Sequence, residues 1–140
     1  MTAGLDSTYP WPDLSFLNGI CHTRSTISIK QITDGTSHTY LIGEKYLAPD
    51  HYATGVVNDD NSCLYTGFED DNFRTSLYPP ARDRRGFGGS GCFFGSAHSS
   101  VWNAAFCDGS IHSLSFNIDP IIHGNLANRR DKNAIPADAL

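Results

Sequence analysis

The chain has 140 residues, of which 18% are charged, and its formal net charge is −5. This length is sufficient for one domain, residues 1–140, with a buried core. The negative balance gives no electrostatic reason to expect a nucleic acid or an acidic membrane surface as partner. No segment approaches the roughly 20 consecutive apolar residues of a membrane-spanning helix, and the first residues lack the basic and apolar regions of a secretion signal.

The first predicted elements are two strands. Residues Thr26 to Ile32 alternate apolar and polar side chains, as a half-buried strand does, and Thr39 to Tyr46 are rich in residues that favour strands. The sequence TDGTS separates them, and its Asp34-Gly35 pair is typical of a turn. Ile29 and Ile32 also fit one helical turn, so the end of the first strand stays open.

The composition changes between residues 48 and 94, where Pro, Gly, Asp, Asn, Arg and Tyr dominate and no period is sustained. We interpret this segment as a long insertion with at most short strands. Two acidic runs within it gather oxygen ligands of the kind that calcium takes, and their candidate ligands are Asp59, Asp60, Asp70 and Asp71. Neither run matches an EF-hand loop, so solvated acidic loops are the simpler interpretation. We therefore expect no cofactor, with calcium as the alternative.

A β-hairpin is predicted after the insertion. Val101 to Cys107 is typical of a strand, Asp108-Gly109 of a two-residue turn, and Ser110 to Asn117 of the returning strand. A two-residue turn would pair Phe106 with Ile111.

A short helix is predicted to follow the hairpin, from Pro120 to Asn128. Asp119 is suited to cap it, and proline is favoured at the first helical position. The helix would bury Ile121, Ile122 and Leu126.

His98 is followed by nine residues and then by Asp108-Gly109. Because a strand rises about 3.3 Å per residue, His98 and Asp108 should lie roughly 20–30 Å apart. They cannot share a proton or a metal within one chain. The hairpin register instead places His98 opposite Asp119, so we predict a structural contact there and a turn at Asp108-Gly109.

The four cysteines have no metal-binding or redox spacing: Cys21, Cys63, Cys92 and Cys107. Their even number favours an oxidising compartment. Three pairings are open, of which Cys63 with Cys92 would bracket the irregular middle of the chain. An enzyme would need Cys92 or Cys107 beside a histidine, His98 or His112, but no signature of such a nucleophile is present.

Two blocks, residues 31–45 (QITDGTSHTYLIGEK) and 94–120 (FGSAHSSVWNAAFCDGSIHSLSFNIDP), resemble a bacterial pseudopilin-like family of unknown function. Its C-terminal region, the prepilin-type processing-associated domain, is defined by His, nine residues and Asp-Gly, which His98 and Asp108-Gly109 match. The resemblance implies structural roles for these residues and for Asp34, Gly35, Glu44 and Asp119. The family is similar to pilins and pseudopilins, which join a long N-terminal hydrophobic helix to an antiparallel-sheet head. The family itself has no established enzymatic activity.

The sequence therefore predicts an α+β domain with an antiparallel sheet, a C-terminal hairpin and a short helix, similar to a pseudopilin head without its N-terminal hydrophobic helix. The resemblance implies a non-enzymatic structural subunit of an extracytoplasmic filament, secretion device or surface assembly, in the periplasm or at the cell surface. Its partners would be further copies or other pseudopilin-like subunits, with membrane contact only through the absent helix. The competing class is a calcium- or glycan-binding surface module, in which Tyr65, Phe68 and Tyr78 would stack on sugar faces.

Overall fold

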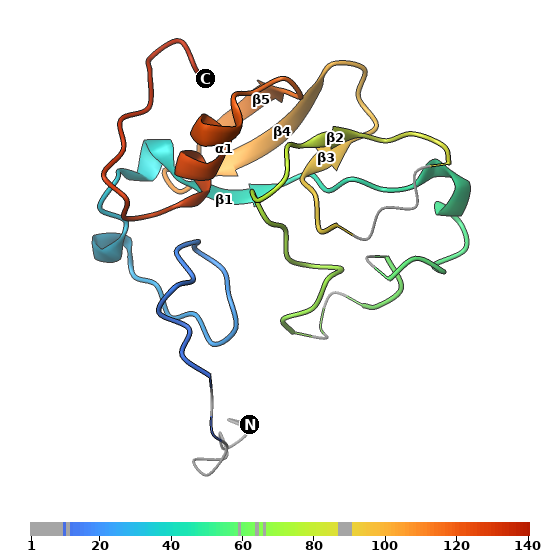
Figure 1. Ribbon diagram of the computed structural model, residues 1–140, viewed down its shortest axis with the longest axis horizontal. Helices are drawn as coiled ribbons and strands as arrows, with labels where there is room; N and C mark the ends of the chain where they lie inside the picture. The colour runs from blue at the N-terminus through green and yellow to red at the C-terminus, as the bar shows by residue number, and fades with distance from the viewer. Residues whose placement is uncertain (1–9, 11, 59, 64, 66, 87–90) are drawn as a thin grey trace.

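The computed structural model describes residue 10 and residues 12–58, 60–63, 65, 67–86 and 91–140. Its elements, in chain order, are three short 3-10 turns, five strands and one helix: η1 (Ile29–Gln31), η2 (Thr36–His38), β1 (Tyr40–Gly43), η3 (Pro49–His51), β2 (Ala81–Arg82), β3 (Gly95–Ser96), β4 (Val101–Phe106), β5 (Ile111–Ser115) and α1 (Pro120–Ala127). An antiparallel sheet has the order β1-β4-β5, and β2 pairs with β3 in parallel. The predicted α+β class is confirmed (Figure 1). No helix in the described part of the chain is long and apolar enough to span a membrane.

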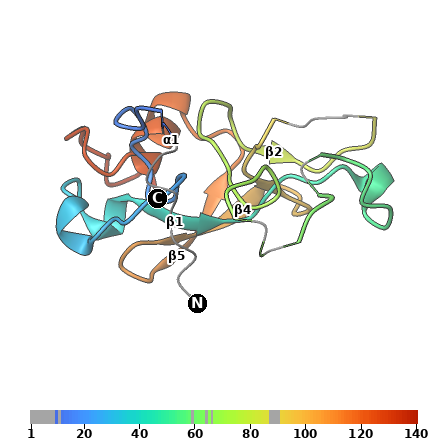
Figure 2. The same cartoon turned by 90° about the horizontal axis from the view of Figure 1, so that it is seen from below.

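α1 covers one face of the sheet (Figures 1 and 2). The buried core residues come from this helix and from all three strands of the sheet. β4 alternates strictly, with Trp102, Ala104 and Phe106 buried and the residues between them half-buried. This is the period of a strand whose successive side chains point to opposite faces. Tyr40 of β1 and Leu126 of α1 complete the centre of the core.

An aromatic cluster surrounds one histidine of α1, His123, whose side chain is fully buried. Its ring centroid lies 5.6 Å from that of Tyr40, 5.6 Å from that of Phe94 and 5.7 Å from that of Trp102. His123 Nδ1 is 3.3 Å from the Tyr40 hydroxyl, the one hydrogen-bond partner of the ring among the described residues. Because burial disfavours the charged imidazole, the helix contributes a neutral histidine to the core.

The predicted hairpin is confirmed, but its register is shifted by one residue. Ala105, rather than Phe106, lies opposite Ile111. The Gly109 N–H donates to the Phe106 carbonyl at 3.0 Å, and the Phe106 N–H donates to the Ser110 carbonyl at 2.9 Å. The loop is therefore three residues long, and Gly109 takes the left-handed conformation with φ of 88° that closes such a loop.

The strand predicted over Thr26 to Ile32 is wrong. This segment pairs with no strand in the described structure, and its central part forms η1, with the Ile29 side chain 74% exposed. The Ser28 N–H donates to Gln31 Oε1 at 2.8 Å, and the Gln31 N–H donates to the Ser28 carbonyl at 2.9 Å. These local hydrogen bonds satisfy the backbone without a neighbouring strand. The second predicted strand is confirmed as β1, which is shorter than predicted.

The predicted helix is confirmed as α1, with the predicted cap. Asp119 Oδ1 accepts hydrogen bonds from the N–H groups of Ile121 and Ile122 at 2.7 and 3.3 Å. The prediction that Ile121 is buried is wrong, because its side chain is 74% exposed and the face toward the sheet carries His123 and Leu126 instead.

The segment from residue 48 to residue 94 contains η3 and the short strand β2, which pairs with β3 (Figure 1). Asp83 anchors it, because its carboxylate accepts hydrogen bonds from the Leu47 N–H at 2.9 Å and the Tyr52 hydroxyl at 2.5 Å. The second contact raises the pKa of Tyr52 to about 12. Glycine is required at position 95, where β3 pairs with β2, since a Cβ there would lie 2.1 Å from the Ala81 carbonyl oxygen.

Burial of His123 makes the stability of the fold depend on pH. The pKa of its imidazole falls from 6.5 to about 4, because burial opposes the charge. Between these two pH values His123 binds more protons in the unfolded chain than in the folded chain. The stability that the buried neutral ring contributes is therefore intact above pH 6.5 and is lost as the pH falls toward 4. The loss is about 1.4 kcal/mol per pH unit.

We expect His123→Leu and His123→Gln to remove this dependence in urea unfolding titrations compared across the pH range. The relevant quantity is the difference in the free energy of unfolding between wild type and variant at each pH, since the carboxylates titrate in both proteins. Identical pH profiles in wild type and variants would contradict the prediction.

Candidate functional site

A polar cluster on the sheet joins the two sequence blocks. His98 Nε2 lies 3.2 Å from Glu44 Oε1, and Glu44 Oε2 accepts hydrogen bonds from the Asn103 N–H at 2.7 Å and from Asn103 Nδ2 at 3.2 Å. The Ser113 hydroxyl donates to Asn103 Oδ1 at 2.7 Å. Both Glu44 and His98 remain partly exposed, at 37% and 54% of their side-chain areas, so solvent weakens the contact between them.

Glu44 takes part in the pairing of β1 with β4 through both its backbone and its side chain. Its N–H donates to the Asn103 carbonyl at 3.0 Å, but its own carbonyl accepts from the Gly95 N–H at 2.9 Å. The carbonyl is therefore turned toward β3, and the carboxylate accepts the Asn103 N–H in its place. A carboxylate that accepts a backbone N–H makes a stronger bond than a neutral acceptor. Glu44 is the central acceptor of the cluster, and His98 is attached to it.

The predicted contact between His98 and Asp119 is wrong. The shifted register and the bend after Ser96 take His98 to Glu44, while Asp119 is occupied in capping α1. His98 and Asp108 make separate contacts, since Asp108 Oδ1 accepts from the Ser110 N–H at 2.9 Å and its hydroxyl at 2.7 Å. The hydrogen bonds from Ser110 lower the pKa of the Asp108 carboxyl.

The two Asp-Gly turns of the sequence are joined through η2 and the hairpin loop. The Cys107 N–H donates to the Thr39 carbonyl at 3.0 Å, and the Asp108 N–H donates to the Thr36 carbonyl at 3.1 Å. Gly35 directly precedes η2 as its N-cap residue, and its carbonyl accepts a hydrogen bond from the Thr39 hydroxyl at 3.0 Å. The hairpin loop is therefore docked against the first block.

Asp34 ties the chain after α1 to the same region. Its carboxylate oxygens accept hydrogen bonds from the Asp131 N–H at 2.6 Å and from the Lys132 N–H at 3.0 Å. Of the residues assigned structural roles, Asp34, Asp108 and Asp119 each accept backbone N–H groups at a turn or helix start.

Two of the four acidic residues proposed for calcium, Asp60 and Asp71, make contacts within the chain. Asp60 lies 2.9 Å from Lys45 Nζ, and the carboxylate of buried Asp71 accepts the N–H groups of Asn61 and Ser62 at 2.7 and 3.1 Å. Burial opposes ionisation of Asp71, but these bonds and one involving Glu69 outweigh it and lower its pKa. No three His, Cys, Asp or Glu side chains gather as a metal site within the described ranges. Asp59 lies outside the described residues.

The predicted disulfides are absent, because the structure describes all four cysteines and joins none of them: Cys21, Cys63, Cys92 and Cys107. The Cys107 thiol lies 3.7 Å from the Tyr40 carbonyl oxygen. Burial raises the pKa of this thiol, which opposes formation of the thiolate that a nucleophile requires.

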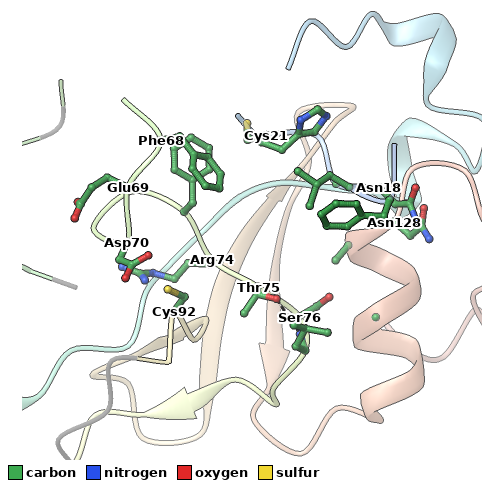
Figure 3. Close-up of a pocket in the computed structure, with 18 residues that line it drawn as sticks. Asn18, Cys21, Phe68, Glu69, Asp70, Arg74, Thr75, Ser76, Cys92 and Asn128 are labelled. Atoms are coloured by element: carbon green, nitrogen blue, oxygen red, sulfur yellow. Dashed lines mark hydrogen bonds between the residues drawn. The ribbon is translucent and has the colours of Figure 1, made fainter. Parts of the chain in front are cut away.

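The structure also contains a hollow that the sequence did not reveal (Figure 3). It has a volume of about 580 Å³. Its wall is formed by Cys92 and by three segments: residues 16–22, residues 68–77 and the C-terminal half of α1 with the following residue, Asn128. Phe68 and Cys21 face Thr75 and Ser76 across it in Figure 3. No sequence period could have indicated this hollow, because its walls come from irregular segments far apart in the chain.

Removing the Glu44 carboxylate should destabilise the fold more than removing the His98 ring. Glu44→Ala leaves the Asn103 N–H without its 2.7 Å acceptor, an expected cost of about 1–3 kcal/mol. His98→Ala breaks a partly exposed side-chain contact, which is expected to contribute about 0–1 kcal/mol. Urea unfolding of both variants at neutral pH measures the difference, and an equal or larger loss in His98→Ala would show that the histidine is the anchor.

A comparison with known protein families gives one match, which includes the first sequence block and the second. The model of the family described as Protein of unknown function (DUF1559) matches residues 3–121. The searches of curated proteins and of solved structures gave no match. Because the family match spans most of the chain, from before the first block to the start of α1, the protein belongs to the DUF1559 family.

Proposed function

We propose that this chain is the head of a pseudopilin-like protein and acts as a non-enzymatic structural subunit of an extracytoplasmic filament, secretion device or surface assembly. In this role it needs no cofactor. Its partners are further copies or other pseudopilin-like subunits. The resemblance of residues 31–45 and 94–120 to pseudopilin-like proteins supports the proposal, and so does the packing of these two blocks into one sheet.

The observation that carries this proposal is the outer edge of β5. Because the Phe106 N–H donates to Ser110, the next residue pair along the hairpin, Ala105 and Ile111, is a non-hydrogen-bonded pair. The backbone N–H and C=O groups of Ile111 and Ser113 therefore point away from β4. On that side the described sheet has no further strand.

β5 lacks the residues and the bulge by which many proteins protect an exposed edge strand. Its sequence, IHSLS, contains no proline, lysine or carboxylate, and the pairing of β4 with β5 has no bulge. The opposite edge strand, β1, is interrupted by an irregularity between Tyr40 and Ile42. A strand from another subunit can therefore pair with β5 more readily than with β1.

An apolar row on the outer face of the sheet ends at the same edge. Ile42, Ala105 and Ile111 are neighbours across the three strands, and the side chains of Ile42 and Ile111 are 67% and 74% exposed. A strand added to β5 would extend the sheet and cover part of this row.

A photo-crosslinking side chain at position 111 tests this contact in cells that produce the protein from its own gene. We expect crosslinks from position 111 to another copy or another pseudopilin-like subunit in the extracytoplasmic fraction. Position 121 on α1 is the matched control, since Ile111 and Ile121 are both 74% exposed. Equal crosslinking from both positions, no crosslink from position 111, or protein confined to the cytoplasm would contradict the proposal.

Two substitutions at Ser113 separate the edge contact from local stability. Ser113→Pro removes the N–H that points outward, which an edge strand tolerates, and should abolish the crosslink. Ser113→Ala loses the same hydrogen bond to Asn103 but keeps the N–H, so the crosslink should remain. If both variants lose the crosslink, the loss is due to the missing Ser113 side chain and not to the missing N–H at the strand edge.

A further inference from the structure

We propose that the hollow between residues 16–22, residues 68–77 and α1 is a binding pocket for a small, uncharged, largely apolar ring compound. Its volume of about 580 Å³ falls within the range of pockets that hold small molecules. The site is separate from the β5 edge, so the inference does not depend on the assembly role.

Apolar side chains on the wall of the pocket are left uncovered by the described protein. Phe16, Phe68 and Leu77 all line it, and their side chains are 69%, 55% and 84% exposed. The rings of Phe68 and Phe73 lie with their centroids 4.4 Å apart. Exposed apolar groups that converge on a concave surface differ from single exposed residues, because a ligand can remove all of them from water together.

A glycine within α1 is the second observation. Gly124 lines the pocket, does not have a positive φ, and a Cβ built on it would meet no atom within 4 Å. Neither the backbone conformation nor packing against the described residues therefore requires glycine here. Glycine inside a helix costs about 0.5–1 kcal/mol relative to alanine. A site where a ligand approaches the helix backbone accounts for this residue.

The charges on the wall favour an uncharged ligand over an anion. Glu69 and Asp70 contribute carboxyl groups, and Arg74 contributes the one guanidinium among the lining residues that the structure describes. Arg74 Nη2 donates to the Asp71 carbonyl at 3.1 Å, so part of its hydrogen-bonding capacity is used within the protein. An anionic ligand would therefore meet carboxyl groups without an excess of positive charge.

The polar groups that remain on the wall can orient such a ligand. Asn18 and Asn128 carry amides, and Thr75 and Ser76 carry hydroxyls. The four side chains lie around the hollow in Figure 3, with the asparagines on the side of α1. A ring compound with one or two neutral hydrogen-bonding groups matches an apolar wall with this polar rim.

Fluorescence titration of the purified chain with N-phenylnaphthylamine tests the pocket, because this uncharged probe becomes fluorescent in apolar surroundings. We expect saturable binding at one site. Anilinonaphthalene sulfonate, which has the same rings and a sulfonate, should bind about fivefold more weakly or worse. Absence of saturable binding of the uncharged probe would overturn the pocket, and equal binding of the two probes would overturn the assigned ligand class.

Substitutions on α1 locate the bound probe. Gly124→Ala should raise the melting temperature by about 3 °C. Gly124→Leu should fill the pocket and weaken binding by about tenfold or more. Asn125→Leu adds the same side chain one position along, outside the pocket lining, and should leave binding unchanged. Equal binding by Gly124→Leu and Asn125→Leu would place the probe elsewhere and overturn the proposal.

Discussion

The burial of one face of β4 is the constraint on which the rest of the fold depends. Trp102 and Phe106 are fully buried, and β1, β5 and α1 each place residues against them. The small side chain of Ala104 lies between these two large ones, which allows the ring of Tyr40 to pack within 5.5 Å of Trp102 and 5.2 Å of Phe106, measured between centroids. The position of β4 therefore determines where β1 and β5 lie, and with them the open edge and the polar cluster.

The residues that mark the two sequence blocks act mainly as acceptors for backbone N–H groups. Glu44 accepts from Asn103, Asp108 from Ser110 and Asp119 from the first turn of α1. The hairpin loop in turn donates to the carbonyls of Thr36 and Thr39. Such contacts hold the irregular ends of the strands in place, where regular pairing stops. They connect the two sequence blocks into one structural unit, on which the proposed assembly role is built.

Elements with strong local signals could be predicted from the sequence. The alternation from Val101 to Phe106, the Asp-Gly turn and the Asp119-Pro120 start of α1 each depend on neighbouring residues, and all three are present. The predicted hairpin register was wrong because Asp-Gly also fits a three-residue loop. In the structure such a loop forms, and Cys107 is its first residue. Thr26 to Ile32 has the period of a strand but lacks a partner strand, and the Ser28 and Gln31 contacts determine its structure.

Long-range features could not be predicted because they depend on segments brought together by folding. The His98 partner lies 54 residues earlier in the chain, and nothing near His98 identifies Glu44. The buried state of His123 depends on the rings of Tyr40, Phe94 and Trp102, which approach it only in the folded chain. The pocket likewise combines three segments, of which two have no regular structure along the wall.

Native-state hydrogen exchange of individual amides tests most directly whether the two blocks form one cooperative unit. The Cys107 and Asp108 amides lie in the hairpin loop but donate to Thr39 and Thr36 of the first block. The account predicts that they exchange only through the same opening as the Phe106 amide of β4, with equal free energies. Exchange of both loop amides much faster than that of Phe106 would show that the loop opens independently, and would contradict the account.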